Sequence, residues 1–156
     1  MNLQEYFKHC GVIKVTKGFG TTYEKLENVV GNQVWICDYR NSEKGADLKP
    51  IRNIKPTLVQ VCRNDEKNRV YYSPVHFREV KENGKLNSRV IAPYDNTGYR
   101  ALTGTSLNIF DTQEECIQCF NRQLGIAIND VMKQSASLAR HFKNKLQDLR
   151  SMIIEG

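Results

Sequence analysis

The chain has 156 residues, a length that fits one ordinary domain, and its 40% hydrophobic and 26% charged residues are typical of a globular protein. No apolar run approaches the ~20 residues that span a bilayer, and the N-terminal residues lack the apolar centre of a signal peptide. The formal net charge of +6 favours an anionic partner, such as nucleic acid, a nucleotide or an acidic protein surface, although modest basicity also serves solubility alone.

The first third of the chain predicts a short helix followed by a strand. Apolar residues recur at helical spacing in residues 2–10, and Gly11 is a natural stop. Residues 12–16 alternate with the period of a strand. Residues 21–30 are ambiguous, because their apolar residues suit either a short helix or an irregular strand.

The middle of the chain predicts antiparallel strands. Residues 33–39 are rich in β-branched and aromatic side chains, and residues 57–62 alternate cleanly. The pair Asn83-Gly84 predicts a hairpin between strands at 76–80 and 86–92, with positive φ at both of its central residues.

Two polar segments predict loops, and a short strand precedes the helical end of the chain. Residues 41–50 and 93–106 lack periodicity and contain glycine and proline. The second loop is long for a compact domain, and long loops often carry function. Residues 107–110 predict a short strand or connector.

A helical pattern runs from residue 112 almost to residue 154. Unbroken, it would be roughly 65 Å long at 1.5 Å per residue, which exceeds a domain of this size. Either the helix breaks, at Gly125 or at residues 135–137, or its end projects and packs on another chain. The apolar stripe continues through Phe142, so we expect a homo-oligomer that pairs through this helix. The alternative is that the helix breaks near Ser135 and folds back onto its own sheet.

The predicted fold is α+β: a bent antiparallel β-sheet or small barrel, followed by a long C-terminal α-helix. Residues 1–110 form the mostly antiparallel β core with its N-terminal helix. Residues 111–156 form the C-terminal helical segment.

The cysteines predict thiols rather than disulfides or a metal site. The chain has five of them at irregular spacing, which fits a reducing cytoplasm. Cys116 and Cys119 form a CxxC pair inside the helix, and His9 with Cys10 offers two further ligand types for zinc. A helical CxxC pair without a second pair more often packs as small apolar groups on a buried stripe. We therefore expect neither a metal nor any other cofactor.

The sequence also lacks catalytic signatures. A nucleophilic cysteine needs a base beside it, and none of the three histidines stands in a recognised catalytic motif. No Walker loop is present. A hydrolase that uses paired carboxylates stays an alternative, because the side chains of Asp38, Asp95 and Asp111 could converge in the fold. We expect a binding protein rather than an enzyme.

Rings and cations alternate along several predicted strands and in the second loop. Aromatic rings stack on bases, and guanidinium groups pair with phosphates. Exposed strand faces carry the same mixture without function, and neighbours such as Phe77 and Arg78 point to opposite faces, so not all of these residues share one site. The candidate ligand contacts are Arg40, Arg52, Tyr72, His76, Arg78, Tyr99, Arg100, Thr103 and Thr105.

Several segments resemble small accessory proteins of T-even-type tailed bacteriophages. The resemblance covers roughly residues 33–125 and is carried by WICDYR at 35–40, RNIKPT at 52–57, VYYS at 70–73, HF at 76–77, APYDNTGYR at 92–100 and FDTQEEC at 110–116. It implies a setting, a phage protein acting in the host bacterial cytoplasm, and assigns no residue a role. Such proteins often counter host defence, in some cases by sequestering a nucleotide immune signal.

The leading hypothesis is a non-enzymatic anti-defence protein that sequesters an anionic nucleotide-type ligand. Arg52, Tyr99 and Arg100 are expected to hold phosphate and base, and Thr103 and Thr105 to donate hydrogen bonds. One alternative is a nucleic-acid-binding protein. The other is a protein-interaction module that inhibits a host enzyme.

Overall fold

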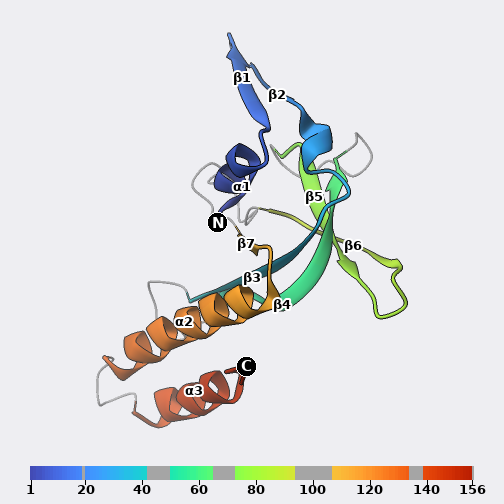
Figure 1. The fold of residues 1–156 in the computed structure, drawn as a ribbon. Helices are drawn as coiled ribbons and strands as arrows, with labels where there is room; N and C mark the ends of the chain where they lie inside the picture. Colours follow the sequence, from blue (N-terminus) through green and yellow to red (C-terminus); the bar gives the residue numbers. More distant parts are fainter. Residues whose placement is uncertain (19, 42–49, 65–72, 94–106, 134–138, 156) are drawn as a thin grey trace.

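The computed structural model describes residues 1–18, 20–41, 50–64, 73–93, 107–133 and 139–155 (Figure 1). The fold is α+β, with two antiparallel sheets. A two-stranded ribbon pairs β1 (Ile13–Lys17) with β2 (Gly20–Glu24). The larger sheet has the order β6-β5-β4-β3-β7, formed by β3 (Gln33–Asn41), β4 (Pro50–Arg63), β5 (Val75–Val80), β6 (Leu86–Ile91) and β7 (Asn108–Phe110). The described strands form an open sheet and no closed barrel, so the first of the two predicted architectures is confirmed.

The predicted N-terminal helix is confirmed as α1 (Leu3–His9). Asn2 caps it, because its side-chain oxygen accepts a hydrogen bond of 2.8 Å from the Glu5 amide. The ambiguous residues 21–30 contain the end of β2 and a 3₁₀ turn, η1 (Leu26–Asn28).

The predicted hairpin between β5 and β6 is present, but its turn differs from the expected one. Only Gly84 has positive φ (+81°), whereas positive φ was expected at Asn83 as well. The Gly84 amide donates to the Lys81 carbonyl at 2.8 Å, and the Lys81 amide donates to the Lys85 carbonyl at 2.9 Å. This is a three-residue loop with glycine at its left-handed position, and the extra residue removes the need for positive φ at Asn83.

Strand β4 begins seven residues earlier than the predicted strand at 57–62. Its register against β3 slips: Ile36 pairs with Thr57, but Asp38 pairs with Ile54. The additional residue on β4 is a bulge, and Pro56 lies in it, where its missing N–H breaks no regular ladder bond. The bulge accompanies the strong curvature of the β3–β4 pair (Figure 1).

The two faces of the sheet carry separate apolar cores. On one face, α1 and η1 bury their apolar side chains against Val34, Ile36, Val59 and Phe77. On the other, Cys37 and Tyr39 pack against helix α2 (Gln113–Met132). Successive strand residues therefore alternate between the cores, as strand geometry requires.

The C-terminal helical pattern divides into two helices. α2 continues through Gly125 and ends at Met132, so the break suggested at Gly125 was wrong; α3 (Ala139–Ser151) follows. α3 folds back along α2 on the side away from the sheet (Figure 1). The side chain of Asn121 in α2 donates to the Ile154 carbonyl at 2.7 Å and accepts from the Ile154 amide at 3.0 Å.

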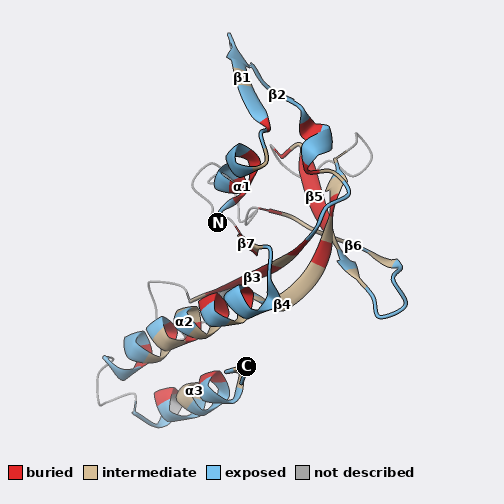
Figure 2. Cartoon of the chain, in the orientation of Figure 1, coloured by how far each residue is buried: buried red, intermediate tan, exposed pale blue. Residues whose placement is uncertain are grey.

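This fold-back covers much of the stripe that motivated the expected oligomer. Phe142 and Leu149 are buried against α2, and Leu146 is half-buried there (Figure 2). Ile153 remains exposed. A homo-oligomer through the C-terminal segment stays a prediction, with less exposed apolar surface than the sequence indicated.

Candidate functional site

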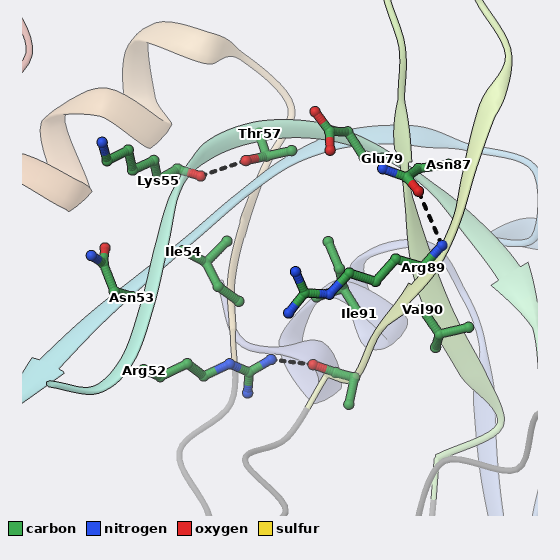
Figure 3. A pocket seen from close by; sticks show the side chains of 11 residues that line it. Arg52, Asn53, Ile54, Lys55, Thr57, Glu79, Asn87, Arg89, Val90 and Ile91 are labelled. Carbon is green, nitrogen blue, oxygen red and sulfur yellow. Dashed lines mark hydrogen bonds between the residues drawn. The ribbon is translucent and has the colours of Figure 1, made fainter.

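A cavity of about 570 Å³ lies where the first half of β4 faces β6. Figure 3 shows its walls: Ile54 and Ile91 point into the space, and Arg89 extends across it from β6. The polar and charged wall residues are Arg52, Asn53, Lys55, Thr57, Glu79, Asn87 and Arg89. Small-ligand sites usually have volumes of ~300–1,000 Å³, so this cavity is large enough for one.

The curvature of β4 produces the cavity. β5 pairs with β4 at residues 59–63, so in the described part of the chain the first half of β4 pairs with β3 alone. That half of β4 bends over the sheet towards β6. The Arg52 guanidinium on it donates a hydrogen bond to the carbonyl of Ala92, the residue just after β6 (Figure 3). This bond joins two strands that are not neighbours in the sheet and fixes one end of the cavity.

The charge around the cavity is predominantly positive. Arg52, Lys55 and Arg89 contribute three cations, and Glu79 contributes one carboxylate. Lys55 and Arg89 are exposed, whereas the Arg52 side chain is only 11% exposed. The Arg52 guanidinium is therefore fixed in the wall, and the exposed Arg89 side chain can adjust to a ligand, whereas the Lys55 side chain extends away from the space between Ile54 and Ile91 (Figure 3).

A buried carboxylate lies behind the wall. Asp38 of β3 is fully buried, with one oxygen 3.4 Å from Arg40 Nε and the other 3.9 Å from Arg52 Nε. Neither oxygen makes a hydrogen bond of good geometry to a described residue. Burial raises the pKa of the Asp38 carboxyl above its usual range, while the charges of Arg40 and Arg52 oppose that rise.

A second polar cluster surrounds His76 on β5. His76 is buried; its Nε2 accepts from Arg78 Nε at 3.3 Å, and its Nδ1 lies 3.3 Å from Asn64 Oδ1. Because arginine can only donate, Nε2 carries no proton, so Nδ1–H is the donor to Asn64. The two described contacts therefore engage both ring nitrogens of His76.

Cys62 lies across from His76 but is not arranged as its nucleophile. The two residues are register partners on β4 and β5. The Cys62 thiol instead donates to the Gln60 carbonyl at 3.6 Å, and burial raises its pKa. A reactive cysteine needs a lowered pKa and a base that can accept its proton.

The CxxC cysteines lie in the α2 core rather than beside His9 and Cys10. Cys116 and Cys119 are buried with Cys37, whose thiol donates to the Cys116 carbonyl at 3.5 Å. Contacts among these thiols and burial raise the pKa of Cys37 and of Cys119. No cluster of three or more metal-ligating side chains is present among the described residues. The apolar-stripe interpretation of the pair fits this packing.

The structure places four of the nine candidate ligand contacts. Arg52 lines the cavity, and its register partner Arg40 lies next to it but contacts Asp38. His76 and Arg78 alternate with Phe77 and Glu79, so they lie on the face of β5 away from the cavity. The remaining five candidates lie outside the described residues: Tyr72, Tyr99, Arg100, Thr103 and Thr105.

Sequence reasoning missed Lys55, Arg89 and Asn87 as cavity residues. Lys55 lies on β4, 32 positions before Asn87 and 34 positions before Arg89, which both lie on β6. The local signal was weak, because single cations on strands usually mark a solvated face.

Of the described helices, none is both long and apolar enough to cross a membrane. Comparisons with protein-family models, with curated proteins and with solved structures found no match to this chain.

Proposed function

We propose that the β4–β6 cavity binds an anionic, nucleotide-type ligand and that the protein acts by holding this ligand rather than by transforming it. The observation that carries the proposal is that Arg52 and Arg89 face one cavity, whose lining also includes Lys55 and a single carboxylate, Glu79. Arginine and lysine are the side chains that proteins use to hold phosphate.

The remaining walls suit the other parts of a nucleotide. Ile54 and Ile91 offer an apolar surface against which a base or sugar can lie, and both also pack on the buried core, so their positions are fixed. Asn53 and Asn87 supply amide donors and acceptors. An apolar wall with a few placed polar groups is the usual composition of a small-ligand site.

The chemistry of the described cysteine and histidine neighbours supports binding without catalysis. His76 has both nitrogens engaged, and the Cys62 thiol has a raised pKa. The resemblance to phage accessory proteins supports a biological setting for such a protein, the sequestration of a host nucleotide signal in the bacterial cytoplasm.

Isothermal titration calorimetry against a panel of cyclic and ADP-ribose-derived nucleotides tests the proposal. We expect at least one member to bind more tightly than millimolar. Arg89→Ala should then weaken binding about tenfold to hundredfold, the effect of one charge-assisted hydrogen bond of roughly 1.5–3 kcal/mol. Arg150→Ala, which removes an exposed arginine from α3, is the matched control and should leave affinity unchanged. Millimolar or weaker binding of every member contradicts the proposal.

One further observation favours the nucleic-acid alternative. The β1–β2 ribbon projects from the body of the protein (Figure 1). Lys14 and Lys17 are exposed on it, and β1 carries no acidic residue. A two-stranded ribbon fits the major groove of DNA. Binding that strengthens with oligonucleotide length and falls steeply with salt would favour this alternative, because each phosphate contact releases counterions.

A further inference from the structure

Asp38, the buried carboxylate behind the cavity wall, has no role in the proposed function. Asp38 contacts a cavity cation directly, since its second oxygen lies 3.9 Å from Nε of Arg52, while the same guanidinium donates to the Ala92 carbonyl in the wall. Arg52 therefore stands between Asp38 and the cavity. A ligand anion near Arg52 would therefore interact with a guanidinium that already forms an ion pair with the Asp38 carboxylate.

We propose that anion binding in the cavity is coupled to proton uptake by Asp38, which acts as an internal counter-ion and limits the affinity at neutral pH. The inference rests on the proposed function, because it concerns the same cavity.

Few groups face Asp38, and this makes its protonation sensitive to a ligand. Arg40 approaches from its own strand and Arg52 from β4; the uncharged amide of Gln123 approaches from α2, and Arg89 stands farther off across the cavity from β6. The adjacent Cys37 thiol has a raised pKa and remains neutral. In the described surroundings, the two nearest arginines are the charges that hold Asp38 ionised.

The direction of the effect follows from electrostatics. Burial already raises the pKa of Asp38, so its proton is gained more readily than that of an exposed aspartate. A second anion beside Arg52 repels the carboxylate and raises this pKa further. By linkage, the affinity for the anion must then rise as the pH falls through the pKa of Asp38.

The expected magnitude is about tenfold. Two unit charges on the order of 10 Å apart in a medium of effective dielectric constant ~20 interact strongly enough to change a binding constant by roughly this factor. A tenfold coupling corresponds to a displacement of about one unit in the pKa of Asp38 when the cavity is filled.

Carbon-13 NMR of the Asp38 carboxyl in the intact protein tests the inference without any substitution. The probe is inorganic sulfate, which remains a dianion throughout the mildly acidic range, compared with sodium chloride at the same ionic strength. We expect the Asp38 titration to move upward by about one unit in sulfate. The exposed Asp148 carboxyl on α3 provides the reference in the same spectra. An Asp38 titration identical in both salts overturns the inference.

A variant supplies the second measurement. Asp38→Asn keeps the shape of the side chain and removes its charge, so sulfate should bind about tenfold more tightly at neutral pH and with a weaker dependence on pH than in the unchanged protein. Asp148→Asn is the matched control. Equal or weaker sulfate binding by a folded Asp38→Asn protein overturns the inference; if the variant does not fold, the carboxyl titration decides.

The two proposals fail in different ways. If sulfate binding is detected and is lost in Arg89→Ala, but Asp38 does not respond to it, only the coupling is wrong. If no anion binds in the cavity, the proposed function and the coupling are both wrong.

Discussion

The link between Asn121 and Ile154 predicts how firmly the C-terminal segment is held on α2. The Asn121 amide makes two hydrogen bonds to the backbone of Ile154, at 2.7 and 3.0 Å. Asn121→Ala removes both at once and leaves the backbone N–H and C=O of Ile154 without these partners. Asn129→Ala changes an exposed asparagine in the same helix and is the matched control.

The expected cost can be worked from these contacts. Two hydrogen bonds at about 1 kcal/mol each give about 2 kcal/mol. Ile154 is half-buried, so water can hydrogen-bond to its backbone N–H and C=O in the variant. The larger cost of a fully buried N–H or C=O without a partner therefore does not apply. Alanine has the better helix propensity and offsets about 0.6 kcal/mol. We therefore expect Asn121→Ala to be destabilised by about 1.5 kcal/mol, and Asn129→Ala to be stabilised by about 0.6 kcal/mol.

Urea unfolding measures the global effect, and amide hydrogen exchange measures the local one. α3 can leave α2 before the whole domain unfolds, so its amides should lose protection first in Asn121→Ala. The reasoning is refuted if Asn121→Ala and Asn129→Ala have the same unfolding free energy and the same protection of α3.

Three further predictions concern stability and thiol reactivity. Gly84→Ala should destabilise by about 1 kcal/mol in urea unfolding, because Gly84 has φ of +81°, whereas Gly125→Ala in open space on α2 should stabilise by a similar amount; equal effects of the two changes would contradict this. Burial raises the pKa of Tyr6 to about 12, so the unfolding free energy should hold below the ordinary pKa of tyrosine near 10 and decline as the pH rises towards 12, and Tyr6→Phe should make that decline smaller; an unchanged alkaline limb in the variant would count against it. Cys37 and Cys119 should react with a thiol reagent only at the rate of unfolding, because both are buried with raised pKa values; rapid labelling of either in the folded protein would disprove their burial.

Local chemistry was enough to predict most of the helices and strands. The helical spacing in residues 2–10, ended by Gly11, corresponds to α1, and the alternation in residues 76–80 corresponds to β5. These patterns act between neighbours a few positions apart, so a single sequence displays them directly. The α+β class follows from the same local patterns taken in order.

Long-range contacts decided the rest of the fold. The first half of β4 contains prolines and polar residues that resemble a loop, and it becomes a strand because β3 pairs with it and a bulge accommodates Pro56. Gly125 alone did not end the helix, since α2 continues through it to Met132, and the other suggested break, at residues 135–137, lies outside the described residues.

Almost none of the candidate site could be predicted from the sequence, because only the tertiary structure brings its residues together. Arg52 was a sequence candidate, but Arg89 lies at the same cavity only because β4 bends over the sheet towards β6. Asp38 was one of three carboxylates considered as a set that converges on one site, and its partners proved to be two arginines. The sequence states which charges exist and what structure their neighbours prefer. Which charged side chains come together, and how deeply they are buried, depends on how the strands curve and pack. Curvature and packing are set by contacts between residues far apart in the chain.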